Sequence, residues 1–408
     1  MRILFFTHYF PPEVNAPATR TYENCKRWVE QGHDVTVITC TPNCPDGIAF
    51  PGYKNKRIQK EEVDGITVYR VWTYLAANQG TIKRIANYVS YMFSATLSGL
   101  FHKPDLIIAT SPQFFCGWAG LLVSKFKGTP FLLEIRDLWP DSISAVGAIK
   151  QNWIIKGLEK LEEWMYRGAD KIVTVGEGYQ RELLQKGVPS DKISIVHNGI
   201  DPTDFYPRAS DLDLKKSLGL QGKFVCSFVG TIGMACGLQV IIESAKQLQK
   251  MGHHDVHFLL VGDGASRAQL ESEVQQKKLT NVTFLGRRKR QEIPGLLAIS
   301  DACLIHLKDH ALFRTVLPSK LFEAAAMARP LIMGVAGEAS KIVENADAGI
   351  CIEPENAQQL TQAILTLKSN PKQAQKWGSN GSSYVRKHFN REILAQNYLQ
   401  LIQRTVEK

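Results

Sequence analysis

This sequence lacks several patterns that would indicate a metal centre, a dinucleotide-binding site or secretion. The eight cysteines are scattered and include no C-x-x-C pair, which argues against a zinc site. Neither the G-x-G-x-x-G fingerprint nor the Walker sequence occurs, so dinucleotide binding and P-loop hydrolysis are not indicated. The N-terminal apolar run is too short for a signal peptide. We therefore expect a protein of the reducing cytoplasm, with residues 2–7 as a buried first strand.

Charge of one sign and long apolar runs are also scarce. The 49 Lys and Arg residues exceed the 39 Asp and Glu residues only modestly, which is far from the balance of a protein that coats nucleic acid. The uncharged stretch at residues 85–101 is at the lower limit of a membrane span and is diluted by Ser, Thr and Asn. It is read as a helix packed on a sheet, a helix resting on a membrane surface, or a span. Residues 50–130 hold ten Lys and Arg against four Asp and Glu; this suits anionic lipid head groups, although such a run is more often a solvated face.

What is present is a globular composition, with 44% hydrophobic and 22% charged residues, in a chain long enough for two or three domains. Short apolar runs alternate with amphipathic stretches, a pattern typical of parallel sheets covered by helices on both faces. Strands are expected at residues 2–7, 34–40, 65–71, 105–110, 130–135, 171–175 and 192–196, and then at 224–230, 256–262, 281–286, 302–307, 329–334 and 349–353. Helices are expected at residues 20–31, 151–167, 238–250, 319–327 and 357–368.

A turn-rich stretch at residues 196–214 separates the two series and predicts a linker or hinge near Asn198 and Gly199. The fold class is therefore α/β, with two doubly wound, Rossmann-like parallel-sheet domains at residues 1–198 and 199–376. A long helical pattern at residues 377–406 is expected to pack back on the first domain. Because ligands bind beyond the carboxyl ends of parallel strands, we expect a site in a cleft that the two domains face.

Two groups of polar residues follow strands and could carry chemistry. Residues 313–330 predict a helix with Ser319 as its N-cap, and with Lys320 and Arg314 near its start. These two cations would suit a diphosphate, and Glu323 could accept hydrogen bonds from a ribose diol; equally, Lys320 could be solvated and Glu323 could serve the helix start. Within residues 134–141, the carboxylates of Glu134 and Asp137 lie at a strand end together with Arg136, which indicates either a site or an ordinary loop.

Eight motifs in order resemble those of one known family. They are residues 8–20 (HYFPPEVNAPATR), 134–142 (EIRDLWPDS), 196–201 (VHNGID), 228–239 (FVGTIGMACGLQ), 259–264 (LLVGDG), 284–304, 312–332 and 334–350. The chain is similar to the retaining GT-B glycosyltransferases of family four, and among these to a WbuB-like subgroup that acts in O-antigen and capsule biosynthesis. The resemblance covers nearly the whole chain, and it lies in the combination, since any single motif is weak.

The resemblance implies that the second domain binds the donor. Glu323 matches the second Glu of the family's E-x7-E motif, which binds the nucleotide ribose, whereas the first position holds Thr315. Many relatives carry an Arg and a Lys on the first loop of this domain, where this chain has Thr231 and Cys236.

Other charges would then neutralise the diphosphate, namely Lys320 and Arg314, while Arg287 matches the loop that typically meets the base. The glycine turns after three strands would let the backbone approach a phosphate. The predicted donor-binding residues are Gly230, Thr231, Gly262, Asp263, Arg287, Arg314, Ser319, Lys320, Leu321 and Glu323.

In the first domain the family's usual His is replaced by Arg136, next to Asp137. Retaining members are thought to let the leaving diphosphate help deprotonate the acceptor, so Asp137 is a candidate for orienting that acceptor. The predicted catalytic residues are Asp137, Arg136, Glu134 and Lys320, and the predicted acceptor-binding residues are Pro12, Asn15, Arg20 and Trp139. The D-x-D at residues 211–213 lies in the linker, so neither a metal nor a cofactor is expected; the nucleotide-sugar is a substrate.

The predicted function is sugar transfer from a nucleotide-sugar, by analogy a UDP-linked N-acetylated amino sugar, to a lipid-linked saccharide acceptor, with retention, in O-antigen or capsule biosynthesis. The expected partners are this donor, this acceptor and the inner-membrane surface, with no nucleic acid. The expected location is cytoplasmic, peripheral on the cytoplasmic face of the inner membrane. Two alternatives stay open: a GT-B nucleotide-sugar 2-epimerase, and a catalytically silent nucleotide-binding homologue, which the missing charges at positions 231, 236 and 315 motivate.

Overall fold

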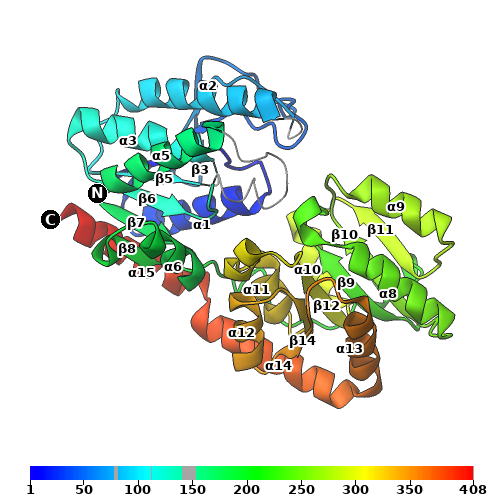
Figure 1. The fold of residues 1–408 in the computed structure, drawn as a ribbon. Coiled ribbons are helices and arrows are strands. Elements are labelled where there is room, and N and C mark those ends of the chain that lie inside the picture. Colours follow the sequence, from blue (N-terminus) through cyan, green and yellow to red (C-terminus); the bar gives the residue numbers. More distant parts are fainter. Residues whose placement is uncertain (78–80, 112, 140–152, 408) are drawn as a thin grey trace. The chain divides into compact units, whose positions relative to one another are not determined.

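The computed structural model describes residues 1–77, 81–111, 113–139 and 153–407. The chain forms two compact units, and each is an α/β sheet with helices on both faces (Figure 1). The first unit comprises Met1–His197 together with Glu392–Lys408, and the second comprises Asn198–Arg391. The predicted fold class, two parallel-sheet α/β domains, is confirmed. The motif at residues 134–142 and the helix expected at 151–167 extend into residues 140–152, which lie outside the described part of the chain.

The sheet of the first unit has its strands at β1 Arg2–Phe6, β2 Asp34–Cys40, β3 Ile58–Val63, β4 Ile66–Val71, β5 Leu106–Thr110, β6 Phe131–Ile135, β7 Lys171–Thr174 and β8 Ile193–Ile195. Their order in space is β3-β4-β2-β1-β5-β6-β7-β8. Every neighbouring pair from β4 to β8 is parallel. The carboxyl ends of β1, β5 and β6 therefore lie at one edge, where the residues that follow them can meet.

The sequence analysis missed β3, and with it the antiparallel pairing of β3 with β4. Asp64 and Gly65 connect the two strands and have φ values of 49° and 78°, as a two-residue hairpin turn requires. No residue of β3 is fully buried, which is typical of an edge strand. The Asp-Gly pair between residues 58–63 and 66–71 is a hairpin signal in the sequence. It was missed because strands were assigned only to buried apolar runs.

Helices cover both faces of this sheet: α1 Ala16–Glu30, α2 Thr81–Gly99, α3 Phe114–Lys127, α5 Trp153–Gly168, α6 Glu177–Gln185 and the C-terminal α15 Arg391–Val406, with a 3₁₀ turn η1 at Ser190–Lys192. Helices α1 and α15 share one face, where the rings of Trp28 and Tyr398 meet at 5.2 Å and Trp28 Nε1 donates a hydrogen bond to Ala395 O. Helices α2 and α3 lie on the other face (Figure 1).

Helix α2 has one buried face and one apolar exposed face. Tyr91 is fully buried, and its single hydroxyl proton is shared between the carbonyl oxygens of Thr7 and Ile38, which lie 2.9 and 2.8 Å from the hydroxyl oxygen. On the other side, Phe93 and Leu97 are 66% and 61% exposed. Among the described residues no helix, α2 included, is both long and apolar enough to cross a membrane.

The sheet of the second unit has its strands at β9 Phe224–Val229, β10 Val256–Val261, β11 Val282–Gly286, β12 Ala302–His306, β13 Leu331–Gly334 and β14 Gly349–Cys351. Their order is β11-β10-β9-β12-β13-β14, with every neighbouring pair parallel. The helices are α7 Leu212–Ser217, α8 Gln239–Lys250, α9 Arg267–Gln276, α10 Ile293–Ala298, α11 Ser319–Ala326, α12 Glu338–Asn345, α13 Ala357–Ser369 and α14 Pro371–His388. Three 3₁₀ turns, η2 Met234–Cys236, η3 Arg290–Glu292 and η4 Ala311–Thr315, follow strand ends.

Residues 196–214 are more ordered than the predicted linker. Phe205 is 1% exposed and belongs to the core of the second unit. Asp211 is the N-cap of α7, and its Oδ1 accepts a hydrogen bond from Leu214 N at 2.9 Å. The first carboxylate of the D-x-D sequence therefore starts a helix, a role that needs no metal ion.

The single helix expected at residues 377–406 is wrong. Helix α14 ends at His388 and α15 begins at Arg391. Between them, Phe389 packs against Phe322 with ring centres 4.6 Å apart, and Asn390 pairs with Ile200. These contacts fix the chain in a non-helical form, so α14 stays with the second unit and α15 packs on the first.

Candidate functional site

Glycine turns at the ends of three strands bring loops of the second unit together. Gly230, Gly262 and Gly286 follow β9 and β10 or end β11, and all three have positive φ. A Cβ atom on Gly262 would stand 1.9 Å from the carbonyl oxygen of Gly230, so only glycine fits there. Hydrogen bonds close the contact, from Gly230 N to Val261 O and from Gly262 N to Gly286 O. The predicted glycine turns thus lie side by side at the carboxyl edge, where open α/β sheets bind ligands.

Lys320 reaches this edge from the start of α11. Its Nζ lies 3.8 Å from the centre of the Phe228 ring, and a Cβ atom on Gly230 would come within 3.3 Å of the same nitrogen. Burial lowers the pKa of Lys320, while Cys236 and Glu323 act in the opposite direction. Among the described residues, Lys320 forms no ion pair. An anion beside Gly230 would therefore supply the partner that this ammonium group lacks.

The start of α11 differs from the prediction in one detail. Pro318 is the N-cap, with an extended φ of −64° and ψ of 128°, and Ser319 is already the first helical residue. The predicted Ser319 cap is wrong because Pro318 adopts the extended conformation that an N-cap requires, one residue earlier. Leu321 is fully buried in the core of the second unit, so its side chain is not available to a ligand.

Glu323 lies one turn after Lys320 on α11, and both line a small cavity with Ser227 and Val229 of β9. Burial raises the pKa of Glu323, opposed by the positive charges of Arg290 and Lys320. A half-buried carboxyl group of this kind is suited to hydrogen bonds with hydroxyl groups.

The other predicted donor residues fall into two places. Arg287 Nε and Asp263 Oδ2 are 3.4 Å apart on neighbouring loops, so these two residues are brought together. Arg314 instead pairs with Asp309 at 3.2 Å, and no described ion pair or hydrogen bond joins it to Lys320. The structure thus gives no contact between Arg314 and Lys320 that would support the prediction that both bind one diphosphate.

The positions that lack the family's charges have local roles. Thr315 is 9% exposed, and its hydroxyl donates to Leu312 O at 2.7 Å. Thr231 is exposed, and its carbonyl oxygen accepts from Cys236 Sγ at 3.2 Å. The Thr315 hydroxyl and the Cys236 thiol thus bind the backbone of their own segments, and the positive charge beside Gly230 is that of Lys320.

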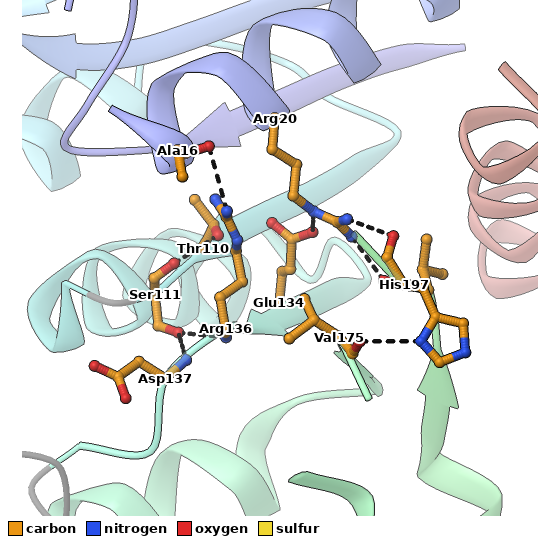
Figure 2. A network of polar contacts seen from close by, with 10 residues as sticks. Ala16, Arg20, Thr110, Ser111, Glu134, Arg136, Asp137, Val175 and His197 are labelled. Atoms are coloured by element: carbon orange, nitrogen blue, oxygen red, sulfur yellow. Dashed lines mark hydrogen bonds and ion pairs between the residues drawn. The ribbon is translucent and has the colours of Figure 1, made fainter. Parts of the chain in front are cut away.

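In the first unit, Arg20 and Glu134 form a buried ion pair between α1 and β6 (Figure 2). Arg20 Nε lies 2.9 Å from Glu134 Oε1, and the two side chains are 6% and 1% exposed. Arg20 also donates to the carbonyl oxygens of His197 at 2.7 Å and Val196 at 2.9 Å. His197 Nδ1 in turn lies 3.1 Å from Val175 O. One arginine thereby ties α1, β6 and the segment after β8 together.

Arg136 lies just after the same strand, and Figure 2 shows it between α1 and the end of β5. Its N–H donates to Ser111 Oγ at 2.8 Å, and its Nη2 donates to Ala16 O at 3.3 Å. Its Nε and Nη1 are buried without a hydrogen-bond partner. Burial lowers the pKa of Arg136 to about 10. Burial also raises the pKa of Glu134, but the charges of Arg20 and Arg136 outweigh that effect and hold it below its ordinary value. Glu134 and Arg136 are therefore both charged at neutral pH.

The predicted acceptor residues have identifiable local roles. Asn15 is the N-cap of α1, and its Oδ1 accepts from Ala18 N at 2.9 Å. Pro12 is exposed in the loop before this helix. Trp139 stacks on Phe114 with ring centres 4.8 Å apart. Asn15 thus positions the loop after β1, while Trp139 offers an aromatic surface.

A small pocket collects Asp137 and Trp139 with residues that the sequence analysis missed, among them Ser111, Gln113 and Tyr166. Gln113 is 2% exposed, and neither atom of its amide has a hydrogen-bond partner. Ser111 directly follows the strand expected at residues 105–110. The rule that singled out Glu134, a polar residue at a strand end, would therefore have found Ser111 had it been applied to that strand.

Two family models match the chain. The one described as glycosyl transferase 4-like domain matches residues 15–199, and the one described as glycosyl transferases group 1 matches residues 211–384. The putative colanic acid biosynthesis glycosyl transferase WcaI of Escherichia coli (strain K12) is 28% identical over 386 residues, which cover 91% of this chain and 94% of that protein. The probable glycosyltransferase WbjE of Pseudomonas aeruginosa is 23% identical over 67% of this chain and 69% of its own.

Solved structures share the whole arrangement of each unit. Anabaena Alr3699/HepE in complex with UDP and glucose superposes with a TM-score of 0.75 at 18% identity, covering 98% of this chain and 99% of that one. WaaG, a glycosyltransferase involved in lipopolysaccharide biosynthesis, gives a TM-score of 0.72 at 14% identity, covering 98% and 99%. At these identities the likeness establishes the fold.

Proposed function

The chain belongs to the family-four GT-B glycosyltransferases, and on this premise we propose that it transfers a sugar from a nucleotide-sugar to a lipid-linked saccharide acceptor. The proposed donor is a UDP-linked N-acetylated amino sugar, transferred with retention at the anomeric carbon. The proposed context is biosynthesis of an O-antigen or capsule. Support comes from the WcaI relative, which is named for colanic acid biosynthesis, and from a structural neighbour solved with UDP and glucose.

One observation carries the donor half of this proposal: the Lys320 ammonium group stands beside Gly230, at the start of α11, and forms no ion pair among the described residues. Negative charge develops on the diphosphate as the glycosidic bond breaks. A half-buried cation and a helix N-terminus stabilise such charge far better than water does. The proposal therefore needs no metal ion and no cofactor.

In the proposed reaction, the bond between the anomeric carbon and the diphosphate oxygen breaks, and a bond to an acceptor hydroxyl oxygen forms on the same face of the sugar. The proton of that hydroxyl goes to the leaving diphosphate. Glu323 would bind the ribose diol, and Arg287 with Asp263 would meet the base. Asp137 would orient the acceptor hydroxyl, with Arg136 beside it.

The buried pair of the first unit takes a different part. Arg20 and Glu134 are too buried to touch a substrate in the described structure, so we assign them a positioning role. They hold the start of α1, which follows the predicted acceptor loop, against the strand end that carries Arg136.

We place the acceptor side at the cytoplasmic face of the inner membrane, because of an apolar patch on the first unit. This α2–α3 patch consists of Phe93, Leu97, Phe101 and Phe126, which are 66%, 61%, 82% and 75% exposed. Phe93 and Leu97 lie one turn apart on the same face of α2, and Phe101 lies in the turn that follows the end of this helix. Lys127 Nζ donates to Leu100 O at 2.7 Å, so the ends of α2 and α3 meet beside Phe101 and Phe126.

Basic residues accompany this patch. Lys83, Lys103 and Lys125 are exposed on or next to α2 and α3. Exposed aromatic side chains with neighbouring lysines suit the boundary between anionic head groups and acyl chains. A lipid-linked acceptor would be reached from such a surface.

The donor assignment is tested with the full chain and a panel of nucleotides. Because a ligand of the native state raises the melting temperature, UDP and UDP-sugars should raise it more than GDP or dTDP. Incubation with a radiolabelled UDP-sugar and an undecaprenyl-diphosphate-linked saccharide should then yield labelled lipid-linked product with unchanged anomeric configuration. A chain that no nucleotide stabilises, or one that epimerises the nucleotide-sugar and makes no glycoside, would contradict the proposal.

The membrane assignment has its own test. The full chain should co-sediment with vesicles that contain phosphatidylglycerol and much less with vesicles of phosphatidylcholine alone. Added salt should weaken the association, since surface charges are screened. No binding to either vesicle would refute the membrane part and leave the donor part intact.

A further inference from the structure

His306 ends β12 and is fully buried beside the loop that follows β9. Its Nδ1 lies 2.7 Å from Cys236 O, and the N–H of Glu355 donates to its Nε2 at 2.8 Å. Since a backbone N–H can only donate, Nε2 is the acceptor and Nδ1 carries the ring proton. The imidazole is therefore neutral and joins two loops that are far apart in the sequence.

Two glycines make room for this ring. Gly334 is its register partner on β13, and a Cβ atom there would stand 2.4 Å from His306 Cδ2. A Cβ atom on Gly237, which has a φ of 57°, would stand 3.2 Å from His306 Cε1. The strand and the loop are therefore shaped around the imidazole.

The backbone of Glu355 shows that the surrounding structure holds this loop in one conformation. Glu355 is a non-glycine residue with a φ of 62°, a backbone conformation that costs free energy and persists where the surroundings hold it. Its N–H is held by His306, and its Oε2 accepts from Asp309 N at 3.0 Å. Asp309 in turn pairs with Arg314, and Lys308 N donates to Ala235 O at 2.9 Å. His306 thus connects the glycine loop to the segment that carries Arg314.

We propose that His306 is a positioning residue for the nucleotide-sugar site, where it holds residues 230–237 and 308–314 in one arrangement and so determines the affinity for the donor. This inference rests on the proposed function. It explains how the loop at residues 230–237 could bind a diphosphate although it carries Thr231 and Cys236 in place of charged side chains. Such a loop contributes through the position of its backbone, and that position has to be fixed from behind.

The charges around His306 agree with a neutral ring. Burial lowers its pKa, and the nearby Lys320 lowers it further. The hydrogen bond to Cys236 O and the charge of Glu355 act in the opposite direction. The side chain of Lys308 also flanks the loop, close to Gly237.

The test separates the two hydrogen bonds of the imidazole. The side chain of His306→Asn can still donate to Cys236 O but no longer accepts from Glu355 N–H. The side chain of His306→Gln can still accept from Glu355 N–H but no longer donates to Cys236 O. We expect His306→Asn and His306→Gln each to raise the KM for the donor about tenfold, with a smaller change in kcat. Each variant loses one of the two hydrogen bonds by which His306 joins the two loops. The matching Kd for UDP, measured by titration calorimetry, should rise by the same factor.

His257 provides the matched control. It is a buried histidine in β10 of the same unit, with Nε2 2.8 Å from Thr283 Oγ1. His257→Asn should lower the melting temperature by a similar amount and leave the donor KM within about twofold, because it touches neither loop. If the His306 variants lower only the melting temperature, as His257→Asn does, the positioning role is refuted.

A surface variant covers the case in which His306 variants fail to fold. Glu355 is exposed, and Glu355→Ala removes the acceptor for Asp309 N–H while leaving its own N–H to His306. The donor KM should rise about threefold; an unchanged KM would overturn the link to residues 308–314. Failure of the proposed function looks different, since the wild-type chain itself would then bind none of the nucleotides.

Discussion

The two units hold their candidate charges in opposite states. In the first unit, Arg20 and Glu134 face each other inside the protein at 2.9 Å, with side chains 6% and 1% exposed. In the second, Lys320 faces the ring of Phe228 and, among the described residues, no carboxylate pairs with it. Arg20 and Glu134 thus neutralise each other within the first unit, whereas Lys320 of the second unit presents a charge that a ligand can neutralise.

This difference separates residues that build a site from residues that act in it. A buried pair is expensive to break because the partner left behind is an unpaired buried charge. A half-buried ammonium group without a partner is expensive to keep, and its removal relieves the fold. Perturbed and unpaired charges of the second kind cluster at functional sites. The comparison predicts that variants in the first unit cost stability, whereas variants at Lys320 cost activity.

The largest effect is expected from Arg20→Leu. Loss of the arginine leaves the Glu134 carboxylate buried and unpaired, so the free energy of unfolding of the first unit should fall by about 3–5 kcal/mol. Urea unfolding, followed by hydrogen exchange of peptides from each unit, would locate the loss. The double variant Arg20→Leu/Glu134→Leu should recover part of it, because no carboxylate is then left buried without its arginine partner. A double variant as unstable as the sum of both single variants would contradict the comparison.

Lys320→Met is expected to do the reverse. Transfer should slow about 10²- to 10³-fold, the usual cost of removing one group that stabilises transition-state charge. The melting temperature should change little, because Met loses the contact of the ammonium group with the Phe228 ring but also removes the cost of a half-buried charge without an ion pair. Lys341→Met, at an exposed lysine of α12, serves as the control and should change neither quantity. Full activity in Lys320→Met would remove the main support for the donor site.

The pH dependence of stability is expected to come from buried histidines in both units. Burial lowers the pKa of His8 in the first unit to about 3, and that of His257 in the second to about 4. Below pH 6.5 the unfolded chain binds a proton that the folded chain does not, so stability is full above this pH and falls as pH decreases. Between pH 6.5 and 4.5 each histidine should cost about 2–3 kcal/mol. His8→Phe should flatten this dependence in the first unit only, as measured by urea unfolding at the two pH values.

Much of the fold was readable because buried parallel strands are continuous apolar runs. Residues 106–110 and 256–261 are entirely buried in the structure, and such runs stand out in the sequence. The half-exposed edge strand at residues 58–63 gave no such run. The interruption at Phe389 and Asn390 was hidden because it depends on partners at Phe322 and Ile200, which local patterns do not reveal.

The candidate site was readable to a similar degree. Polar residues after strands led to Glu134, Arg136 and Lys320, but their separate roles required burial and pairing. Arg20 and Glu134 are 114 residues apart in the chain, and no spacing rule predicts that they neutralise each other. His306 looked like one more residue of an apolar strand, since its hydrogen bonds go to loops around positions 236 and 355.

The smallest expected effect concerns the surfaces of the two units. In the first unit the α2–α3 patch brings together Phe93 and Leu97 of α2 with Phe101 just after this helix. In the second unit Leu212 and Met251 lie on separate elements and are 75% and 57% exposed. Replacing Phe101 by Ser should weaken binding to phosphatidylglycerol vesicles about tenfold, the value of roughly 1.5 kcal/mol for burying one large apolar side chain, and leave the melting temperature unchanged. Met251→Ser should leave vesicle binding unchanged, because an isolated apolar side chain has no neighbours with which to enter the head-group region. Equal losses of vesicle binding in the two variants would mean that binding does not depend on the α2–α3 patch. The difference between the two surfaces would then have no bearing on membrane binding.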